Sequence, residues 1–266
     1  MRILLTNDDG IYAPGLRALH AELCQLGEVL VVAPATEQSA AGHSVTIYSP
    51  LLVQEVLDPS KGFQGWAVEG RPADCVKLAL RQILPWKPDL VVSGINSGSN
   101  AGINVLYSGT VGAAIEGAFF QMPSIACSME MPGNEPANFA LGARLALQVI
   151  KDILGKKPDP GDLFNVNVPD LCRGPIKGVR VVPQNTASYV EWFDKRVDPR
   201  GRVYYWIGPD FTCPEPHPDT DVTALAEQWI TVTPLQFNLT RFPALEIMND
   251  WNWENTTGQL ATESVR

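Results

Sequence analysis

The 266-residue sequence has few cysteines, few histidines and no surplus of basic side chains. Its five cysteines are scattered and form no C-x-x-C pair, which argues against a zinc site or a disulfide framework and favours buried, reduced thiols. Lysine and arginine total 20 against 29 acidic residues, and the net charge of -9 argues against a surface for nucleic-acid polymers. Small molecules are therefore the expected partners.

Long hydrophobic runs are also missing. No apolar stretch approaches the roughly 18 residues that a membrane-spanning helix needs. The chain enters an apolar strand at Ile3, which leaves no room for a signal peptide. We therefore expect a cytoplasmic protein with no membrane partner.

Several motifs of phosphate and nucleotide chemistry are absent. No G-x-x-x-x-G-K-[ST] sequence occurs, which excludes a P-loop NTPase, and no G-x-G-x-x-G follows the first strand, which counts against a dinucleotide oxidoreductase. The absence of G-x-S-x-G disfavours an α/β-hydrolase. Asp8 and Asp9 are adjacent, unlike the D-x-D of phosphatases that form an aspartyl-phosphate.

The sequence does contain a regular alternation of strand and helix patterns. Strands are predicted at residues 3–5, 29–33, 89–92, 124–127, 163–168 and 178–182, with shorter strands or a hairpin over 45–68. Helices are predicted at residues 16–23, 72–84, 110–120 and 139–154. This alternation predicts an α/β fold with a mostly parallel sheet in a Rossmann-like three-layer core.

The character of the chain changes near residue 184. We expect an α/β catalytic core over residues 1–183 and, over 184–266, an extension of the same structural unit. In it, Tyr189–Phe193 and Val203–Ile207 are predicted to pair as a hairpin that turns at residues 198–201. A strand at 230–233 and a helix at 244–251 should follow. Four of the seven tryptophans lie between Trp206 and Trp253, which favours a packing or subunit-contact element over a second catalytic domain.

Two adjacent carboxylates, Asp8 and Asp9, follow the first strand directly. Ligands bind at the carboxyl ends of strands in open α/β sheets. Neighbouring residues of a strand point to opposite faces, so both side chains can converge only once the strand has ended, and Gly10 permits that bend. The two carboxylates repel each other, and a divalent cation would hold both ionised.

The second and third strands end in polar loops as well. In a parallel sheet these loops emerge at the same edge as Asp8 and Asp9. Ser39 and Asn96 then supply neutral oxygens beside the two carboxylates, an all-oxygen set that suits Mg²⁺, Mn²⁺ or Ca²⁺ rather than zinc. The alternative for the aspartate pair is an ordinary turn with a solvated helix cap.

The third loop is also suited to phosphate. Its glycines allow backbone amides to approach an anion, and Ser108, Gly109 and Thr110 lead into a helix whose N-terminus attracts negative charge. The alternative is a glycine-rich turn in which Thr110 caps the helix. His43 in the second loop is a weaker candidate proton donor. For Arg71 and Asp74 we favour a structural role at a helix start.

These residues resemble the survival protein SurE family. The resemblance is carried by Asn7-Asp8-Asp9-Gly10, Val32-Ala33-Pro34 with Ser39, Gly70 to Asp74, Val92 to Asn96 and Tyr107 to Val111, and continues at 165–169, 205–208 and 233–235. It implies a metal-dependent nucleotidase that releases phosphate from nucleoside 5′- and 3′-monophosphates, with one divalent ion, Mg²⁺ or Mn²⁺, on Asp8, Asp9, Ser39 and Asn96. It also implies a homodimer or homotetramer with exchanged C-terminal segments. Arg71 departs from the family, which commonly has a small hydroxyl residue there.

We expect metal-assisted attack of water on a phosphomonoester, with Asp8, Asp9 and Asn96 as the catalytic residues. Asp8 would orient or deprotonate the water, and Asn96, Ser108, Gly109 and Thr110 would contact the phosphate. Two alternatives stay open: a non-catalytic nucleotide sensor, and a phosphatase or exopolyphosphatase for another phosphate ester. Only a substrate panel separates the second from a nucleotidase.

Overall fold

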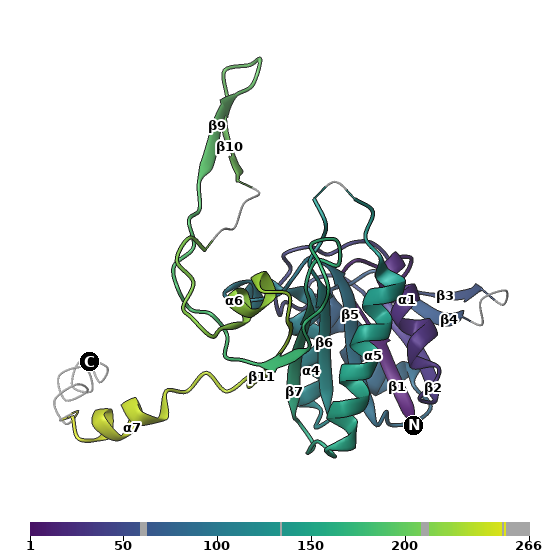
Figure 1. Ribbon diagram of the computed structural model, residues 1–266. Coiled ribbons are helices and arrows are strands. Elements are labelled where there is room, and N and C mark those ends of the chain that lie inside the picture. Colours follow the sequence, from purple (N-terminus) through teal and green to yellow (C-terminus); the bar gives the residue numbers. More distant parts are fainter. Residues whose placement is uncertain (59–62, 134, 209–212, 252, 254–266) are drawn as a thin grey trace, which may run out of the picture. The chain divides into compact units, whose positions relative to one another are not determined.

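The structure is a computed structural model that describes residues 1–58, 63–133, 135–208, 213–251 and 253 (Figure 1). The chain forms two compact units, Met1–Leu235 and Gln236–Arg266. Of the predicted extension, residues 209–212, 252 and 254–266 lie outside the described residues. Its division from the core at residue 183 stays a prediction.

The first unit is built on a nine-stranded sheet with the order β3-β4-β2-β1-β5-β6-β7-β11-β8. The pairings across β4-β2-β1-β5-β6-β7 are all parallel, while β3 runs antiparallel to β4 and β11 antiparallel to β7. The strands are β1 (Arg2–Thr6), β2 (Glu28–Pro34), β3 (Val53–Asp58), β4 (Phe63–Val68), β5 (Leu90–Ser97), β6 (Ser124–Met129), β7 (Leu163–Val168), β8 (Val179–Val181) and β11 (Ile230–Leu235). The mostly parallel sheet is confirmed, and 45–68 contains a hairpin.

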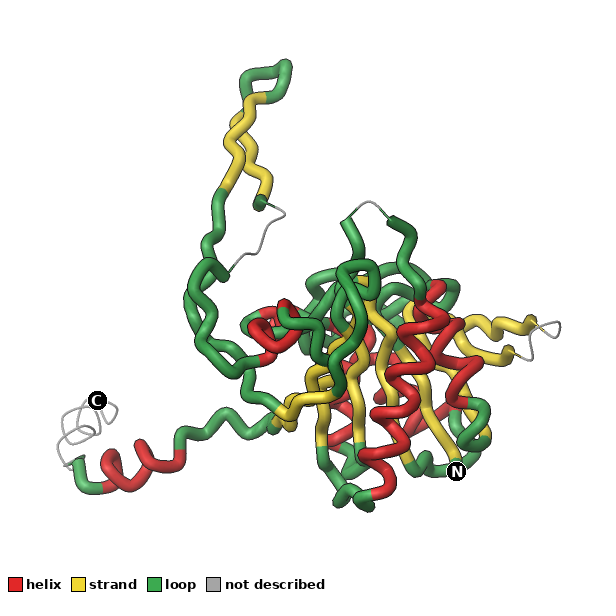
Figure 2. Tube along the Cα trace, in the orientation of Figure 1, coloured by secondary structure: helices red, strands yellow, loops and turns green. Residues whose placement is uncertain are grey.

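Helices cover both faces of this sheet (Figure 2). On one face α1 (Pro14–Leu23) packs beside α5 (Phe139–Gly155), and on the other α2 (Pro72–Leu78) packs beside α4 (Gly109–Phe119). A π-helical turn over Ala79–Ile83 continues α2. Two short helices, α3 (Asn104–Tyr107) and α6 (Asp221–Ala226), also belong to this unit.

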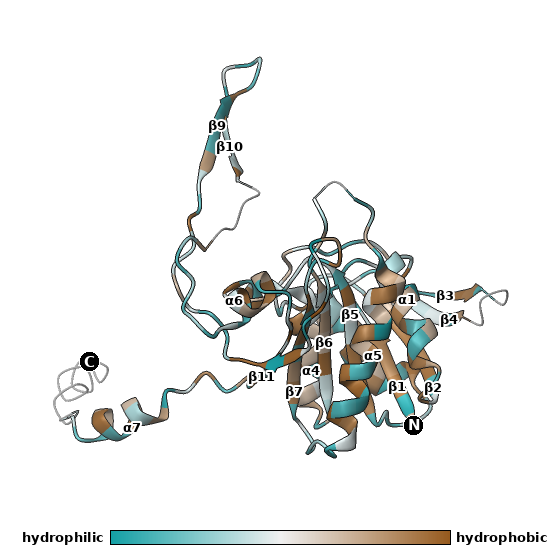
Figure 3. Cartoon of the chain, viewed as in Figure 1, coloured by the Kyte–Doolittle hydropathy of each residue, from teal (hydrophilic) through white to brown (hydrophobic). Residues whose placement is uncertain are grey.

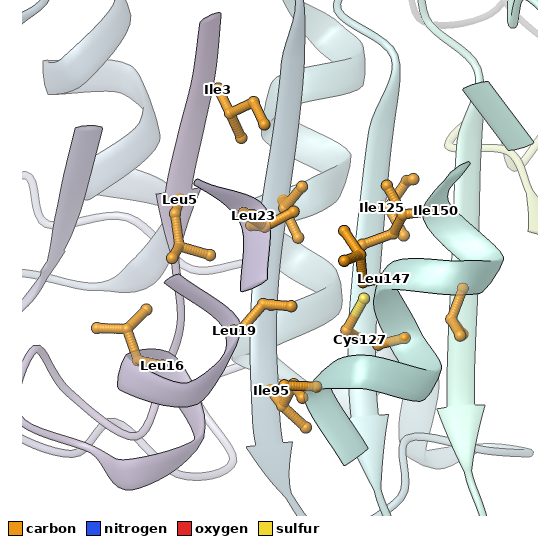
Figure 4. Close-up of a cluster of buried hydrophobic side chains, with 14 of the residues drawn as sticks. Ile3, Leu5, Leu16, Leu19, Leu23, Ile95, Ile125, Cys127, Leu147 and Ile150 are labelled. Atoms are coloured by element: carbon orange, nitrogen blue, oxygen red, sulfur yellow. The ribbon is translucent and has the colours of Figure 1, made fainter. Parts of the chain in front are cut away.

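The alternation of side chains along the strands produces the three layers. Ile3 and Leu5 point toward α1 and α5, whereas Leu4 packs with residues of α2 and α4 on the opposite face. Figure 4 shows Leu16, Leu19 and Leu23 of α1 against the strands, together with side chains of α5. In Figure 3, β1 and β7 are largely brown, as expected for strands buried on both faces.

The predicted hairpin is present, but its first strand is displaced. β9 (Phe193–Val197) pairs with β10 (Val203–Ile207) in the register Val197 to Val203. The prediction of Tyr189–Phe193 was therefore wrong. The turn was predicted correctly: the Asp198 carboxylate accepts the backbone N–H groups of Arg200 and Arg202 at 2.8 and 2.9 Å. The turn fixes the register of the two strands, so the residue that pairs with Val203 is Val197, directly before Asp198.

The last helix and the cysteines differ in part from the predictions. The last described helix, α7 (Phe242–Asn249), begins two residues before the predicted one and belongs to the second unit. All five cysteines are free, but only Cys75 and Cys127 are buried, while Cys24 and Cys172 are exposed. The expectation of buried thiols was thus only partly correct. No helix in the described part of the chain is long and apolar enough to cross a membrane.

Candidate functional site

A cavity of about 820 Å³ lies at the carboxyl ends of β1, β2 and β5, where the three polar loops meet. It brings together Asp8, Asp9, Ser39, Asn96 and Ser108, five residues predicted for the site. The lining consists of Asp8, Asp9, Ala13, Pro14, Glu37, Ser39, Ala40, Asn96, Ser97, Ser99, Asn100, Asn104, Tyr107, Ser108, Glu191 and Ile207. The convergence of loops that are far apart in the sequence is what a parallel sheet predicts.

Asp8 is held at the N-terminus of α4. The backbone N–H of Thr110 donates to Asp8 Oδ2 at 3.0 Å, and the Thr110 hydroxyl donates to Oδ1. Burial, reinforced by the charge of Asp9, raises the pKa of Asp8 from 3.8 to about 6 even though the bonds from Thr110 oppose this rise. Asp8 is therefore held in one orientation, and the hydrogen bonds from Thr110 do not fully stabilise its negative charge.

The Ser108–Thr110 segment serves mainly to position Asp8. Ser108 lines the cavity and caps α4 by accepting the N–H of Val111 at 3.1 Å. Thr110 is fully buried, and neither it nor Gly109 contributes to the cavity wall. A side chain at Gly109 would collide with Asp8, because a Cβ there would lie 2.9 Å from Asp8 Cβ. Contact of these residues with phosphate stays a prediction.

Asp9 is oriented by the end of β5. Its Oδ2 accepts the backbone N–H of Ser97 at 2.9 Å and the Ser97 hydroxyl at 3.1 Å. Burial is the main cause that raises the pKa of Asp9, and the negative charge of Glu37 adds to it. Asn96, one residue before Ser97, donates its Nδ2 to Gly98 O at 2.7 Å, which leaves the carbonyl oxygen Oδ1 for a ligand.

Ser39 reaches the cavity from the loop that follows β2. Its hydroxyl donates to the Glu37 carboxylate, and the backbone N–H of Gln38 donates to Asp8 O at 2.8 Å. This loop is thus joined directly to the strand end that carries the aspartates. Glu37 was not among the predicted site residues, although it stands in the second of the polar loops from which Ser39 was chosen.

The described cavity wall carries four carboxylates, Asp8, Asp9, Glu37 and Glu191, and no lysine, arginine or histidine. The donor set of Asp8, Asp9, Ser39 and Asn96 is entirely oxygen, which fits a hard divalent cation. Among the described residues no three His, Cys, Asp or Glu side chains gather closely enough to bind a metal ion. A cation here would therefore need the hydroxyl and amide oxygens as well.

Neutral polar residues of the third loop were also missed. Ser99, Asn100 and Asn104 line the cavity, and Asn100 is fixed because its N–H donates to Asn167 Oδ1 at 2.8 Å. Their position within the polar loop was the available signal. Tyr107 adds an aromatic ring to the wall, and Glu191 and Ile207 come from the hairpin segment. No local pattern marked these last two as site residues.

The weaker candidates lie outside the described cavity wall. Asp74 accepts the backbone N–H groups of Arg71 at 2.8 Å and Thr46 at 3.0 Å, which agrees with a structural role at the start of α2. The Arg71 guanidinium donates to Gln38 Oε1 at 2.9 Å. His43 contacts the carboxylate of Glu116 rather than the cavity.

Comparison with known proteins identifies the family of this chain. The family described as "Survival protein SurE" matches residues 3–191. The chain belongs to the SurE family. It is 52% identical over 255 residues to "5'-nucleotidase SurE" of Rhodopirellula baltica, a match that covers 95% of this chain and 99% of that protein. It is 43% identical over 252 residues to the protein of the same name from Syntrophobacter fumaroxidans, covering 95% and 100%. The solved SurE protein from Aquifex aeolicus, 39% identical, superposes with a TM-score of 0.80 over 94% of this chain and 98% of its own.

Proposed function

We propose that this SurE family member is a 5'-nucleotidase, a metal-dependent phosphomonoesterase that hydrolyses nucleoside 5′- and 3′-monophosphates to nucleoside and phosphate. Its relatives at 43% to 52% identity carry the name 5'-nucleotidase. The match to the first of these covers 95% of the chain, and the family match over residues 3–191 includes all three loops of the cavity.

The observation that carries this proposal is the charge of the cavity. Its described wall holds four carboxylates and no basic side chain. A phosphate ester would be repelled there, so binding of such a substrate requires a cation between wall and ligand. Asp8, Asp9, Ser39 and Asn96 are the residues that would hold this ion, with Mg²⁺ or Mn²⁺ as the best candidates.

The bound ion would supply Lewis-acid stabilisation of a phosphoryl oxygen and would lower the pKa of a coordinated water. Asp8, which lines the cavity beside the proposed ion, would accept a proton from the attacking water. Thr110 keeps Asp8 in one orientation during this transfer. The new bond joins the water oxygen to phosphorus, and the nucleoside oxygen leaves and takes a proton.

The extension over residues 184–266 is proposed to serve oligomerisation, as a homodimer or homotetramer. Every residue of β10 is exposed, Tyr205 and Trp206 included, and β9 is exposed apart from Asp194. Apolar aromatic surface of this kind favours contact with another subunit.

A cytoplasmic location is proposed as well, and the free state of all five cysteines agrees with a reducing compartment.

Asp8→Asn tests the proposal. With AMP and Mn²⁺, release of inorganic phosphate should fall by about 10²- to 10⁴-fold, because the variant loses a metal ligand and the proton acceptor. Asp152→Asn, which removes an exposed carboxylate of α5, is the matched control and should keep full activity. Full activity of Asp8→Asn, or of the native protein in excess EDTA, would refute the metal mechanism. AMP binding without turnover by the native protein would favour a nucleotide sensor, and a panel including polyphosphate would reveal another phosphatase.

A further inference from the structure

The loop from Ala35 to Thr46, here called the Ser39 loop, has an unusual backbone. Ala40 has a φ of 53° and Gly42 a φ of 56°, both in the left-handed region. A non-glycine residue such as Ala40 adopts this conformation at a cost of about 1–2 kcal/mol. It persists only where the surroundings hold it. Because Ser39 and Ala40 both line the cavity, whatever holds the loop also sets the position of the Ser39 oxygen.

Helix α4 and Tyr107, the last residue of α3, provide that support. The backbone N–H of Gly42 donates to Tyr107 O at 2.9 Å. His43 Nε2 lies 2.7 Å from Glu116 Oε2 of α4, and the His43 ring stacks on Phe119 with the centroids 5.6 Å apart. The backbones also meet closely: a Cβ at Gly112 would lie 2.8 Å from Gly42 O.

Glu116 is a buried carboxylate with two partners. Its Oε1 accepts a hydrogen bond from Lys77 Nζ of α2 at 2.7 Å, while Oε2 faces His43. Burial alone would raise the pKa of Glu116, but the hydrogen bonds and charges of His43 and Lys77 outweigh it and lower that pKa. Glu116 is therefore an ionised anchor. Only one of these two partners, His43, belongs to the Ser39 loop.

The same helix fixes Asp8 at its N-terminus through Thr110. α4 thus joins two members of the donor set, Asp8 at its first turn and Ser39 through the loop that His43 fastens to its middle. We propose that His43 is a positioning residue that fixes the Ser39 loop to α4 and so sets the affinity of the site for a divalent cation. This inference rests on the proposed function, because it assumes that Ser39 is a metal ligand.

The test measures Mn²⁺ affinity of the full chain, from the electron paramagnetic resonance signal of free Mn²⁺. His43→Ala should weaken binding by roughly 10-fold or more, the size typical when a residue that orients metal ligands is removed. Lys77→Met is the matched control: it removes the other partner of the same carboxylate but leaves the loop attached. It should change Mn²⁺ affinity less than about threefold, even if both variants lose similar thermal stability.

A second pair of variants tests whether the hydrogen bond to Glu116, and not the imidazole ring itself, holds the loop. Glutamine at position 43 is long enough to donate to Glu116, whereas asparagine is too short. His43→Gln should bind Mn²⁺ within about threefold of the native protein, and His43→Asn should be as weak as His43→Ala. This pair also decides the matter if His43→Ala does not fold.

Equal Mn²⁺ affinity in the native protein, His43→Ala and His43→Asn would overturn the inference while leaving the proposed function intact. Equal weakening by His43→Ala and Lys77→Met would also overturn it, because the effect would then come from Glu116 and not from the loop. Absence of Mn²⁺ binding by the native protein would instead refute the metal site itself, and the inference with it.

Discussion

The substitution Gly109→Ala tests how tightly α4 packs on Asp8. A Cβ at this position would lie 2.9 Å from Asp8 Cβ, 3.0 Å from Asp8 Oδ2 and 3.1 Å from Pro72 Cγ. Such distances are shorter than ordinary carbon contacts of about 3.5–4.0 Å. Gly109 is the first residue of the helix, and alanine is a good helix former, so the effect of the added methyl group should be steric.

This crowding should lower both the stability and the catalytic efficiency of the Gly109→Ala variant. Inserting a methyl group into a packed interior costs about 1–3 kcal/mol, which corresponds to a fall in Tm of roughly 2 to 10 °C for a chain of this size. Relief requires that α4 or Asp8 moves, and Thr110 couples the two. Because a displacement of about 1 Å in a catalytic group costs on the order of 100-fold in rate, we expect kcat/KM for AMP to fall about 10- to 100-fold.

The assays are thermal unfolding and phosphate release from AMP with Mn²⁺. Gly155→Ala is the control, since Gly155 ends α5 and nothing lies within 4 Å of a Cβ placed there. It should leave both quantities unchanged or raise Tm slightly. Native values of Tm and kcat/KM in Gly109→Ala would show that α4 does not pack tightly against Asp8 and that position 109 tolerates a methyl group.

Two further predictions concern Asp8 and Gly112. Burial, with the charge of Asp9, raises the pKa of Asp8 from 3.8 to about 6, so in the absence of metal the folded state binds more protons than the unfolded state between these values. The contribution of Asp8 to the free energy of unfolding should therefore fall by about 3 kcal/mol as pH rises through this window. Urea unfolding in EDTA should accordingly find Asp8→Asn more stable than the native protein at pH 7, and equal stability there would contradict the burial argument. Gly112→Ala places a Cβ 2.8 Å from Gly42 O and 3.0 Å from His43 Cα, and should weaken Mn²⁺ binding about 10-fold by pushing the Ser39 loop from α4. Unchanged affinity in that variant would mean that the loop position does not govern the site.

The sequence predicted the convergence of the site because convergence depends on strand polarity alone. Asp8 and Ser39 follow parallel strands and Asn96 lies near the end of one, so the sheet brings all three to one edge. The role of Thr110 was harder to foresee, because a helix N-terminus can bind a phosphate or a carboxylate equally well. Only the distance to Asp8 distinguishes the two.

The elements that sequence reasoning placed poorly depend on distant partners. β11 enters the main sheet between β7 and β8 although it lies in the predicted extension. Its local pattern fits a strand in either place, and its pairing with residues 163–167 is a contact over more than sixty residues. Glu191 and Ile207 likewise line the cavity through contacts with residues far away in the sequence. Periodicity reports which face of a strand is buried, but not which neighbour buries it.

The adjacent aspartates Asp8 and Asp9 therefore do not form a metal motif by themselves. Asp8 takes its orientation from Thr110 of α4, and Asp9 takes its orientation from Ser97 at the end of β5. Burial makes both carboxylates harder to ionise, which destabilises the metal-free fold at neutral pH. A cation that bound the folded site would offset this cost, and the stability it added would rise with the logarithm of its affinity. In the proposed metal site, the groups that destabilise the metal-free fold are thus the same groups that would bind a divalent ion and, through that ion, a phosphate ester.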